Sequence, residues 1–322
     1  MPFLIAVTRR VPEEGLKILQ AQKNFRLRVS PYDRILTRPE LLKFVKGADA
    51  ILTQLTDKID MTVLRAAGPQ LKIVANYAVG FDNIDLAACR QTGVTVTNTS
   101  GVLTQAVAEH TIALMMAVGK RLVEADKFSR AGKYKGWAPM LLLGMQFTGK
   151  TLGIVGTGRI GSVVAQFAVK GLGMNLIYSD PVANKELEKN LNAARVSFEE
   201  LLALTDVVSL HVPLLPSTRH LISKREFGLM KRNAYLINTS RGPIVDEKEL
   251  VRALRTRKIA GAAIDVWEFE PKLTPGLSKL ENVVITPHTA SATYEARAAM
   301  AVLAAENIVE VLGGRKAKTP VS

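Results

Sequence analysis

The chain has 322 residues, a length that predicts about two domains, each large enough to bury its own core. Hydrophobic residues make up 48% and charged residues 22%, which excludes a disordered or collagen-like chain, and the single cysteine excludes a disulfide framework and a cysteine-rich zinc site. Lysine and arginine outnumber aspartate and glutamate by 43 to 29, a formal charge of +14. We expect a cytoplasmic protein without a membrane partner, because no secretory signal or long apolar span is visible. We also expect no bound metal ion.

Short apolar runs and amphipathic stretches alternate along the first hundred residues. Phe3–Val7 predicts a strand, and residues 13–22 predict a helix with Leu16 and Leu19 on one face. The same rhythm predicts strands at 48–54, 72–76 and 94–97 and helices at 61–67 and 83–91. Such alternation is typical of a parallel sheet flanked by helices, so this segment is expected to form an α/β domain.

A different pattern follows between residues 104 and 131, which predict a single long helix with more than one apolar face. A polar and aromatic loop comes next and contains Trp137. A second alternating series then predicts strands at 152–155, 175–179, 207–212, 235–238, 261–266 and 283–286, which matches a dinucleotide-binding sheet. A last helix is expected over residues 292–312.

A glycine motif, G-T-G-R-I-G, directly follows the first strand of this second series and opens a helix. Gly156 would allow a tight turn, Gly158 would let the backbone approach a pyrophosphate, and Gly161 would let helix and strand pack closely. Arg159 and Ile160 lie between the last two glycines. In this context the motif predicts that the chain binds a dinucleotide.

An acidic residue, Asp180, ends the next predicted strand, at the spacing where such a carboxylate binds the ribose hydroxyls. Because it would also repel a 2′-phosphate, it favours NAD(H) over NADP(H) as the cofactor. The competing interpretation is a turn residue before Pro181.

Three charged residues, Arg241, Glu270 and His288, each follow a later strand, where open α/β sheets place their sites. Reduction of a 2-keto acid needs a cation that grips oxygen atoms, a proton donor, and a carboxylate that keeps this donor charged. Arginine, histidine and glutamate suit these roles in that order. The competing interpretations are a solvated turn for Arg241, a surface acid for Glu270 and a loop or cap residue for His288. Of the remaining histidines, His110 is expected to be structural and His220 to lie on the surface. His211 is expected to be a satisfied residue of the core or a residue near the site.

The chain at this point resembles a known family, the D-isomer-specific 2-hydroxyacid dehydrogenases, and within it the glyoxylate/hydroxypyruvate reductases. The resemblance runs essentially from end to end. It rests on ordered blocks that include N-Y-A-V-G-F-D-N-I-D from Asn76, V-L-T-Q-A-V-A-E-H from Val102, N-T-S-R-G-P-I-V-D from Asn238, D-V-W-E-F-E-P from Asp265 and T-P-H-T-A-S-A-T from Thr286.

The resemblance implies an α/β fold of two Rossmann-like domains with parallel sheets. A flavodoxin-like substrate domain would comprise residues 1–100 and 290–322, and an NAD-binding Rossmann domain residues 101–289. The final helix would therefore rejoin the first domain.

The resemblance also assigns roles to individual residues. Arg241, Glu270 and His288 fall on the family's catalytic positions, in agreement with the roles argued above. Residues implied to bind the substrate are Asn76, Val79, Gly80 and Trp137, and those implied to contact the cofactor, besides the glycine motif and Asp180, are Thr104, Pro213, Thr239 and Asp265. Family members are usually homodimers, in which the tryptophan of the 132–139 loop reaches the partner's site. NADP(H) is the alternative cofactor, since some of these reductases prefer NADPH.

The function predicted in this way is reduction of a small anionic 2-keto acid, glyoxylate or hydroxypyruvate, to the D-2-hydroxy acid by hydride transfer. The alternatives are a D-lactate-type, phosphoglycerate or phosphite-type dehydrogenase, or an NAD-sensing, corepressor-like binding protein on the same fold. The positive charge is dispersed and lies beside no nucleic-acid-binding motif, so no nucleic-acid partner is expected.

Overall fold

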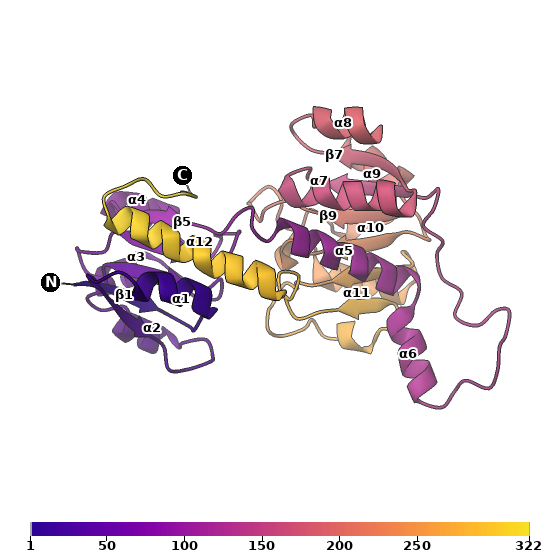
Figure 1. The fold of residues 1–322 in the computed structure, drawn as a ribbon. Coiled ribbons are helices and arrows are strands. Elements are labelled where there is room, and N and C mark those ends of the chain that lie inside the picture. The colour runs from indigo at the N-terminus through magenta and orange to yellow at the C-terminus, as the bar shows by residue number, and fades with distance from the viewer. Residues whose placement is uncertain (1, 322) are drawn as a thin grey trace. The chain divides into compact units, whose positions relative to one another are not determined.

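The structure, a computed structural model, describes residues 2–321 and divides the chain into two compact units. Unit 1 joins Met1–Leu103 to Ala292–Ser322, and unit 2 is the continuous segment Thr104–Ser291. The chain therefore leaves its first unit and returns to it at the end (Figure 1).

Unit 1 contains a parallel sheet whose five strands are β1 (Phe3–Val7), β2 (Phe25–Val29), β3 (Ala50–Thr53), β4 (Ile73–Asn76) and β5 (Thr95–Thr97). In space the strands follow the order β2-β1-β3-β4-β5, and all of their pairings are parallel. This is the flavodoxin-like order, as predicted for this part of the chain.

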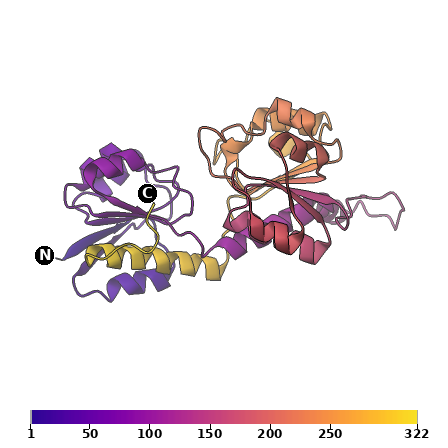
Figure 2. The ribbon, with the colours of Figure 1, turned by 90° about the horizontal axis from the view of Figure 1, so that it is seen from above.

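Helices cover both faces of this sheet. One face packs against α2 (Arg38–Phe44), α3 (Met61–Ala67) and α4 (Leu86–Thr92). Figures 1 and 2 show the other pair, α1 (Glu13–Gln20) and α12 (Tyr294–Leu312), side by side. Gly15 permits this close packing, because a Cβ at that position would lie 2.4 Å from the carbonyl oxygen of Ala301.

Unit 2 contains a sheet of seven strands, β6 (Thr151–Val155), β7 (Asn175–Ser179), β8 (Ala194–Arg195), β9 (Val207–Leu210), β10 (Tyr235–Asn238), β11 (Gly261–Ile264) and β12 (Val283–Ile285). The order is β12-β11-β10-β9-β6-β7-β8, and every pairing is parallel. This is the Rossmann order with one strand added, which confirms the predicted fold class. The order in which successive strands are added reverses between β6 and β9, and ligands bind at such switch points.

Two layers of helices enclose the second sheet (Figure 2). One core cluster packs the sheet against α5 (Thr104–Gly119), α7 (Arg159–Gln166) and α8 (Lys185–Leu191), and a π-helical turn, Phe167–Gly171, extends α7. The other cluster involves α9 (Phe198–Leu204), α10 (Lys224–Leu229) and α11 (Glu247–Arg255). Short 3-10 turns follow β10 at Gly242–Ile244 and precede β12 at Leu277–Lys279.

One predicted element is wrong, because residues 104–131 form two helices rather than one. α5 ends at Gly119, Arg121 takes the left-handed conformation with φ of 56°, and α6 (Leu122–Arg130) follows with no buried residue. Sequence reasoning also missed β2, α2 and β8. Within the described residues 2–321, no helix is long and apolar enough to span a membrane.

Candidate active site

The glycine motif forms the turn between β6 and α7, at the switch point of the second sheet. Gly156 has φ of +91°, and a Cβ there would lie 2.8 Å from the carbonyl oxygen of His211. A Cβ on Gly161 would lie 2.2 Å from the carbonyl oxygen of Gly156, so only glycine fits at this position in the first turn of α7. Gly158 caps α7 and faces open space. A bare backbone at a helix N-terminus fits the pyrophosphate of a dinucleotide.

Asp180 connects the end of β7 to this glycine turn. Its Oδ2 accepts hydrogen bonds from the N–H of Thr157 at 2.7 Å and from the hydroxyl of Thr157 at 3.1 Å, and its Oδ1 accepts from the N–H of Val182 at 2.9 Å. The residue therefore supports the turn, and its carboxylate lies beside the position where the turn would hold a dinucleotide.

The other residues predicted to contact the cofactor lie along the same edge of the sheet or at the start of α5. Arg159 and Ile160 begin α7, Pro213 follows β9, and Thr239 follows β10. The hydroxyl of Thr239 lies 2.9 Å from that of Thr111 on α5, a helix that begins at Thr104. Loops that follow adjacent parallel strands meet at one edge, which accounts for this grouping.

His288 and Glu270 come together after β12 and β11. The Nδ1 atom of His288 lies 3.1 Å from Oε2 of Glu270, and Oε1 of Glu270 accepts a hydrogen bond from the N–H of Trp267 at 3.2 Å. The two side chains are about a quarter and a third exposed, at 25% and 31%. Since Nδ1 faces the carboxylate, Nε2 is the atom that could pass a proton to a ligand.

Asp265 organises the loop that carries His288. Its Oδ1 accepts hydrogen bonds from the hydroxyl of Thr286 at 2.6 Å and from the N–H of Thr289 at 2.8 Å, and its Oδ2 accepts from the N–H of Ala290 at 2.8 Å. The Nε2 atom of His110 lies 3.4 Å from Oδ1. Burial raises the pKa of Asp265, but these polar partners outweigh it and hold the pKa below its ordinary value.

Arg241 lies after β10, and the loop that carries it packs against the Glu270 loop. A Cβ on Gly242 would lie 1.9 Å from the backbone carbon of Trp267, so only glycine allows the two backbones to meet. The buried side chain of Asn238 braces the turn: its Nδ2 donates to the carbonyl oxygen of Arg241 at 2.9 Å and its Oδ1 accepts from the N–H of Ser240 at 3.0 Å.

The predicted substrate loop follows β4 in unit 1. Asn76 is buried, and its Nδ2 donates to the carbonyl oxygen of Gly80 at 2.8 Å and lies 3.3 Å from Oδ1 of Asn83. Asn76 thus shapes the turn that presents the backbone of Val79 and Gly80. Both residues are partly exposed, and neither amide N–H donates to another group of the described chain. Two free amides in one turn suit a carboxylate.

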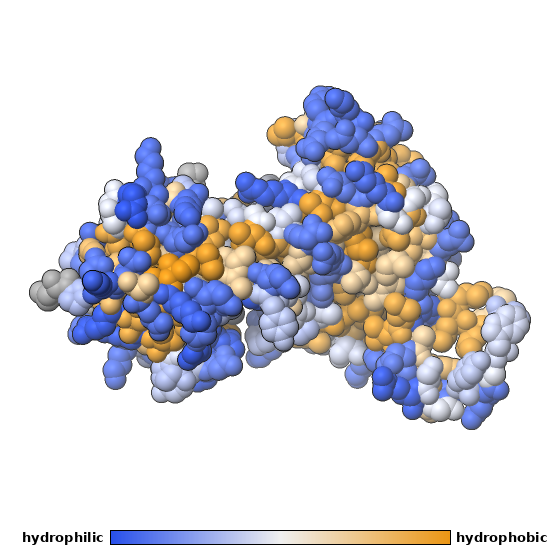
Figure 3. All heavy atoms as spheres, in the orientation of Figure 1, coloured by the Kyte–Doolittle hydropathy of each residue, from blue (hydrophilic) through white to orange (hydrophobic). Residues whose placement is uncertain are grey.

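Trp137 lies in residues 131–150, a long segment with no helix or strand, and it is 83% exposed. The segment lies at the lower right of Figure 3, where hydrophobic atoms gather on its surface. Large exposed hydrophobic residues of α6 and this segment are Leu122, Val123, Tyr134, Trp137, Met140 and Leu143.

The remaining histidines have polar partners that their local sequence does not show. His110, expected to be structural, lies 3.1 Å from the hydroxyl of Thr286 beside Asp265. His220, expected on the surface, is half-buried and lies 2.7 Å from Glu268. His211 lies next to Gly156 with its Nε2 2.8 Å from the Ser209 hydroxyl, and loss of hydration lowers its pKa to about 3. Asn238 and Asn83 were not identified, since nothing in their local sequence distinguishes them from other turn residues.

Comparison with known proteins agrees with this arrangement. The family model described as D-isomer specific 2-hydroxyacid dehydrogenase, NAD binding domain, matches residues 112–290. The glyoxylate reductase of Thermococcus litoralis is 47% identical over 314 residues, which cover 96% of this chain and 94% of that protein. The crystal structure of the TT0316 protein from Thermus thermophilus has a TM-score of 0.93 and 43% identity, covering 99% of this chain and 100% of that one. A glyoxylate reductase structure from Paecilomyes thermophila has a TM-score of 0.89 and 31% identity, covering 99% of this chain and 98% of that one.

The family match covers the sheet with the glycine turn and extends through His288, and the full-length relatives extend the likeness to unit 1. The resemblance inferred from sequence blocks is thereby confirmed. This chain belongs to the D-isomer-specific 2-hydroxyacid dehydrogenase family and is an oxidoreductase with an NAD-binding domain.

Proposed function

We propose that this enzyme reduces glyoxylate to glycolate or hydroxypyruvate to D-glycerate, in each case the 2-hydroxy acid. The contact of 3.1 Å between His288 and Glu270 carries the proposal, because a carboxylate against one ring nitrogen orients the imidazole and leaves Nε2 to pass a proton to a ligand. The substrate is suggested by the relatives, of which those from Thermococcus litoralis and Paecilomyes thermophila are named glyoxylate reductases.

Each catalytic group has one task in the proposed mechanism. When bound, the nicotinamide cofactor supplies a hydride to the keto carbon of the substrate. His288 donates its proton to the carbonyl oxygen, and Arg241 stabilises the negative charge that develops there. The amides of Val79 and Gly80 hold the substrate carboxylate, and Asn76 keeps their turn in shape.

For the cofactor, we propose NADH rather than NADPH. The carboxylate of Asp180 would accept hydrogen bonds from the ribose hydroxyls and repel a 2′-phosphate. The residues proposed to surround the rest of the dinucleotide are Thr104, Gly156, Gly158, Arg159, Ile160, Gly161, Pro213, Thr239 and Asp265. Asp180→Asn keeps an oxygen acceptor for Thr157 and removes the charge, so it should raise the NADPH/NADH ratio of kcat/KM. An unchanged ratio would show that Asp180 acts only in the turn.

The substrate is tested with a panel of glyoxylate, hydroxypyruvate, pyruvate and 3-phosphohydroxypyruvate, each assayed with NADH and with NADPH. We expect the highest kcat/KM for glyoxylate or hydroxypyruvate with NADH. A clear preference for pyruvate would replace the proposal with a D-lactate-type enzyme, and one for the phosphorylated acid with a phosphoglycerate-type enzyme. Oxidation of phosphite in the reverse assay would indicate a phosphite-type enzyme, and cofactor binding without turnover of any acid a corepressor-like protein.

We further propose that two copies form a homodimer through α6 and the segment 131–150. Trp137, Met140 and Leu122 are exposed by 83%, 76% and 53%, an apolar surface that association would cover. In the dimer Trp137 would contribute to the partner's substrate site. Light scattering should give the mass of two chains, and Trp137→Ala should raise the KM for the keto acid. A monomer with normal turnover would refute this arrangement.

A further inference from the structure

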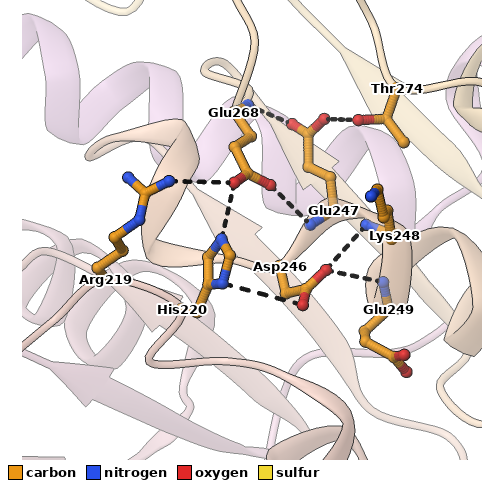
Figure 4. A network of polar contacts seen from close by, with 8 residues as sticks. All are labelled: Arg219, His220, Asp246, Glu247, Lys248, Glu249, Glu268 and Thr274. Carbon is orange, nitrogen blue, oxygen red and sulfur yellow. Dashed lines mark hydrogen bonds and ion pairs between the residues drawn. The ribbon is translucent and has the colours of Figure 1, made fainter.

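A buried carboxylate holds the Glu270 loop on both sides of Glu270. Glu247, the first residue of α11, is only 1% exposed. Its Oε1 accepts from the N–H of Glu268 at 2.6 Å, and its Oε2 accepts from the hydroxyl of Thr274 at 2.5 Å. Figure 4 shows the carboxylate between these two donors. One side chain therefore binds the loop two residues before Glu270 and again four residues after it.

The side chain of Glu268 contacts the backbone of Glu247 in turn, and it also contacts two further side chains. Its Oε2 accepts from the N–H of Glu247 at 3.4 Å, while its Oε1 lies 2.7 Å from Nε2 of His220 and 3.5 Å from the guanidinium of Arg219 (Figure 4). Asp246 lies on the far side of the imidazole, 3.9 Å from Nδ1. The side chain of Glu268 is 6% exposed, so its carboxylate depends on Arg219 and on the imidazole of His220 for polar contacts.

The same network reaches the loop that carries Arg241. The N–H of His220 donates to the carbonyl oxygen of Pro243 at 2.8 Å, two residues after Arg241. The backbone contact at Gly242 and Trp267 joins this loop directly to the Glu270 loop. Arg241 and Glu270 are thus carried by loops that share one set of supports.

Capping of α11 does not account for the buried carboxylate. The cap is Asp246, whose side chain accepts from the N–H groups of Lys248 and Glu249. Burial raises the pKa of Glu247, which shows that its charge is costly at this position. A costly carboxylate that is not needed as a cap, and whose oxygens both bind the Glu270 loop, points to a role in holding that loop.

We propose that Glu247 and Glu268 are positioning residues of the reaction, which hold residues 268–274 so that Glu270 faces His288. The inference rests on the proposed function in that His288 is taken as the proton donor. Neither residue needs to touch substrate or cofactor. Their effect is transmitted through Glu270, whose carboxylate accepts a hydrogen bond from the same loop at Trp267.

The first test is kinetic and uses Glu247→Ala. A misplaced Glu270 should lower kcat by roughly ten- to hundredfold, since small errors of position are costly in catalysis. The KM for the keto acid and the Kd for NADH should change by no more than about twofold, because ground-state binding is untouched. The basic limb of the kcat profile should move to lower pH, as a poorly stabilised imidazolium loses its proton earlier.

Two further variants separate positioning from general damage. Glu247→Gln keeps an oxygen for the N–H of Glu268 and an amide for the Thr274 hydroxyl, so it should restore most of kcat. Glu249→Ala is the matched control, because Glu249 lies in the same helical turn but its carboxylate pairs with Arg252. It should behave as wild type. If Glu247→Ala does not fold, Thr274→Val removes one of the two contacts and should give the same changes at smaller size.

A double-variant cycle shows whether the effect passes through Glu270. In a Glu270→Gln background, Glu247→Ala should cause little further loss of kcat. Independent losses that multiply in the double variant, or a loss of kcat with an unmoved pH profile, would overturn the positioning role.

A readout without turnover separates this inference from the proposed function. The chain has four histidines, so the ring signals can be followed by NMR in the protein with bound NADH. The titration midpoint of the His288 ring should fall in Glu247→Ala and not in Glu249→Ala. An unmoved midpoint overturns the positioning role whatever the substrate. A lower midpoint in a protein that reduces no 2-keto acid upholds positioning and refutes the proposed function.

Discussion

At the scale of single residues, His288 occupies an unusual backbone conformation. Its backbone has φ of +54°, in the left-handed region that few non-glycine residues adopt. The loop is kept there by bonds to Asp265, whose carbonyl oxygen accepts from the N–H of His288 at 2.8 Å and whose carboxylate holds the N–H groups of Thr289 and Ala290. Strained positions of this kind recur at functional sites, where the surroundings determine the conformation.

The proton-donor role predicts a specific loss in His288→Asn. Asparagine tolerates the left-handed conformation, so the loop should keep its shape while the acid is removed. We expect kcat to fall by about 10²–10⁴-fold, the usual contribution of acid–base catalysis, with little change in the Kd for NADH. Steady-state kinetics and fluorescence titration measure the two quantities. Turnover within a few-fold of wild type would exclude His288 as the donor.

Asp265 predicts a pH-dependent change in stability. Its pKa is held below its ordinary value, so its stabilising effect is present above that value and is lost as pH falls through the lower, folded-state pKa. Asp265→Asn places an amide against N–H donors, which should cost about 1–3 kcal/mol at pH 7. Urea unfolding at pH 7 and at pH values well below the ordinary aspartate pKa should show the difference shrinking in acid. A constant difference would argue against an ionised Asp265.

At the scale of elements, α1 and α12 form an extensive helix contact in unit 1, and a glycine allows it. Both helices cover the same face of the first sheet, although they lie at opposite ends of the chain (Figure 2). Gly15 is buried between them. Helices can approach this closely only where no Cβ intervenes.

This packing predicts that Gly15→Ala is destabilising. The added Cβ would lie 2.4 Å from the backbone oxygen of Ala301, so α1 and α12 must separate. Overpacking of this kind costs about 1–3 kcal/mol, measured as the free energy of unfolding. Gly228→Ala is the control, since that helical glycine of α10 has no atom within 4 Å of the added Cβ and should be neutral or stabilising. Equal stability of the two variants would contradict the packing argument.

The elements also show which parts of the fold can be predicted from sequence patterns. Strands buried on both faces, such as β6 and β10, are predicted because their apolar runs are continuous. The ends of β10, β11 and β12 predict where Arg241, Glu270 and His288 lie. The edge strand β2 was missed because Arg26 and Arg28 interrupt its apolar residues. The break after α5 was missed because no glycine marks the left-handed Arg121.

The polar contacts that hold the loops of the site could not be predicted from the sequence, and the reason is a different one. His220 and Glu268 are separated by 48 positions, and Thr274 and Glu247 by 27. Hydrophobic periodicity describes neighbours within a helix or strand and carries no information about which distant polar side chains will meet. Such pairs become visible only when the loops of the sheet are placed side by side.

At the scale of the whole molecule, the net charge of +14 is the property that bears on stability and on ligand binding. Many basic side chains lie in local ion pairs, as in Arg34 with Glu40 and Arg121 with Glu124, and such exposed pairs contribute little to stability. A net positive charge attracts anionic ligands from a distance, as the proposed keto acid and dinucleotide would be.

Electrostatic steering predicts that kcat/KM for the keto acid falls as ionic strength rises. The screening length shortens to about 10 Å at 0.1 M salt, so the attraction of a distant anion weakens while contacts within the site persist. The kcat at saturating substrate should be nearly constant in the same series. A kcat/KM that is independent of salt between low and physiological ionic strength would show that the charge is background.

The return of the chain to its first unit sets the order in which the protein can be assembled during synthesis. Unit 2, Thr104–Ser291, is continuous and has its whole core once its last strand is made. Unit 1 begins first but cannot close the face beside Gly15 until α12 emerges, after residue 294. Domains ordinarily fold from the N-terminus as the ribosome releases them. Here unit 1 must wait for its own last helix, so the apolar face of its sheet stays uncovered until α12 has been made.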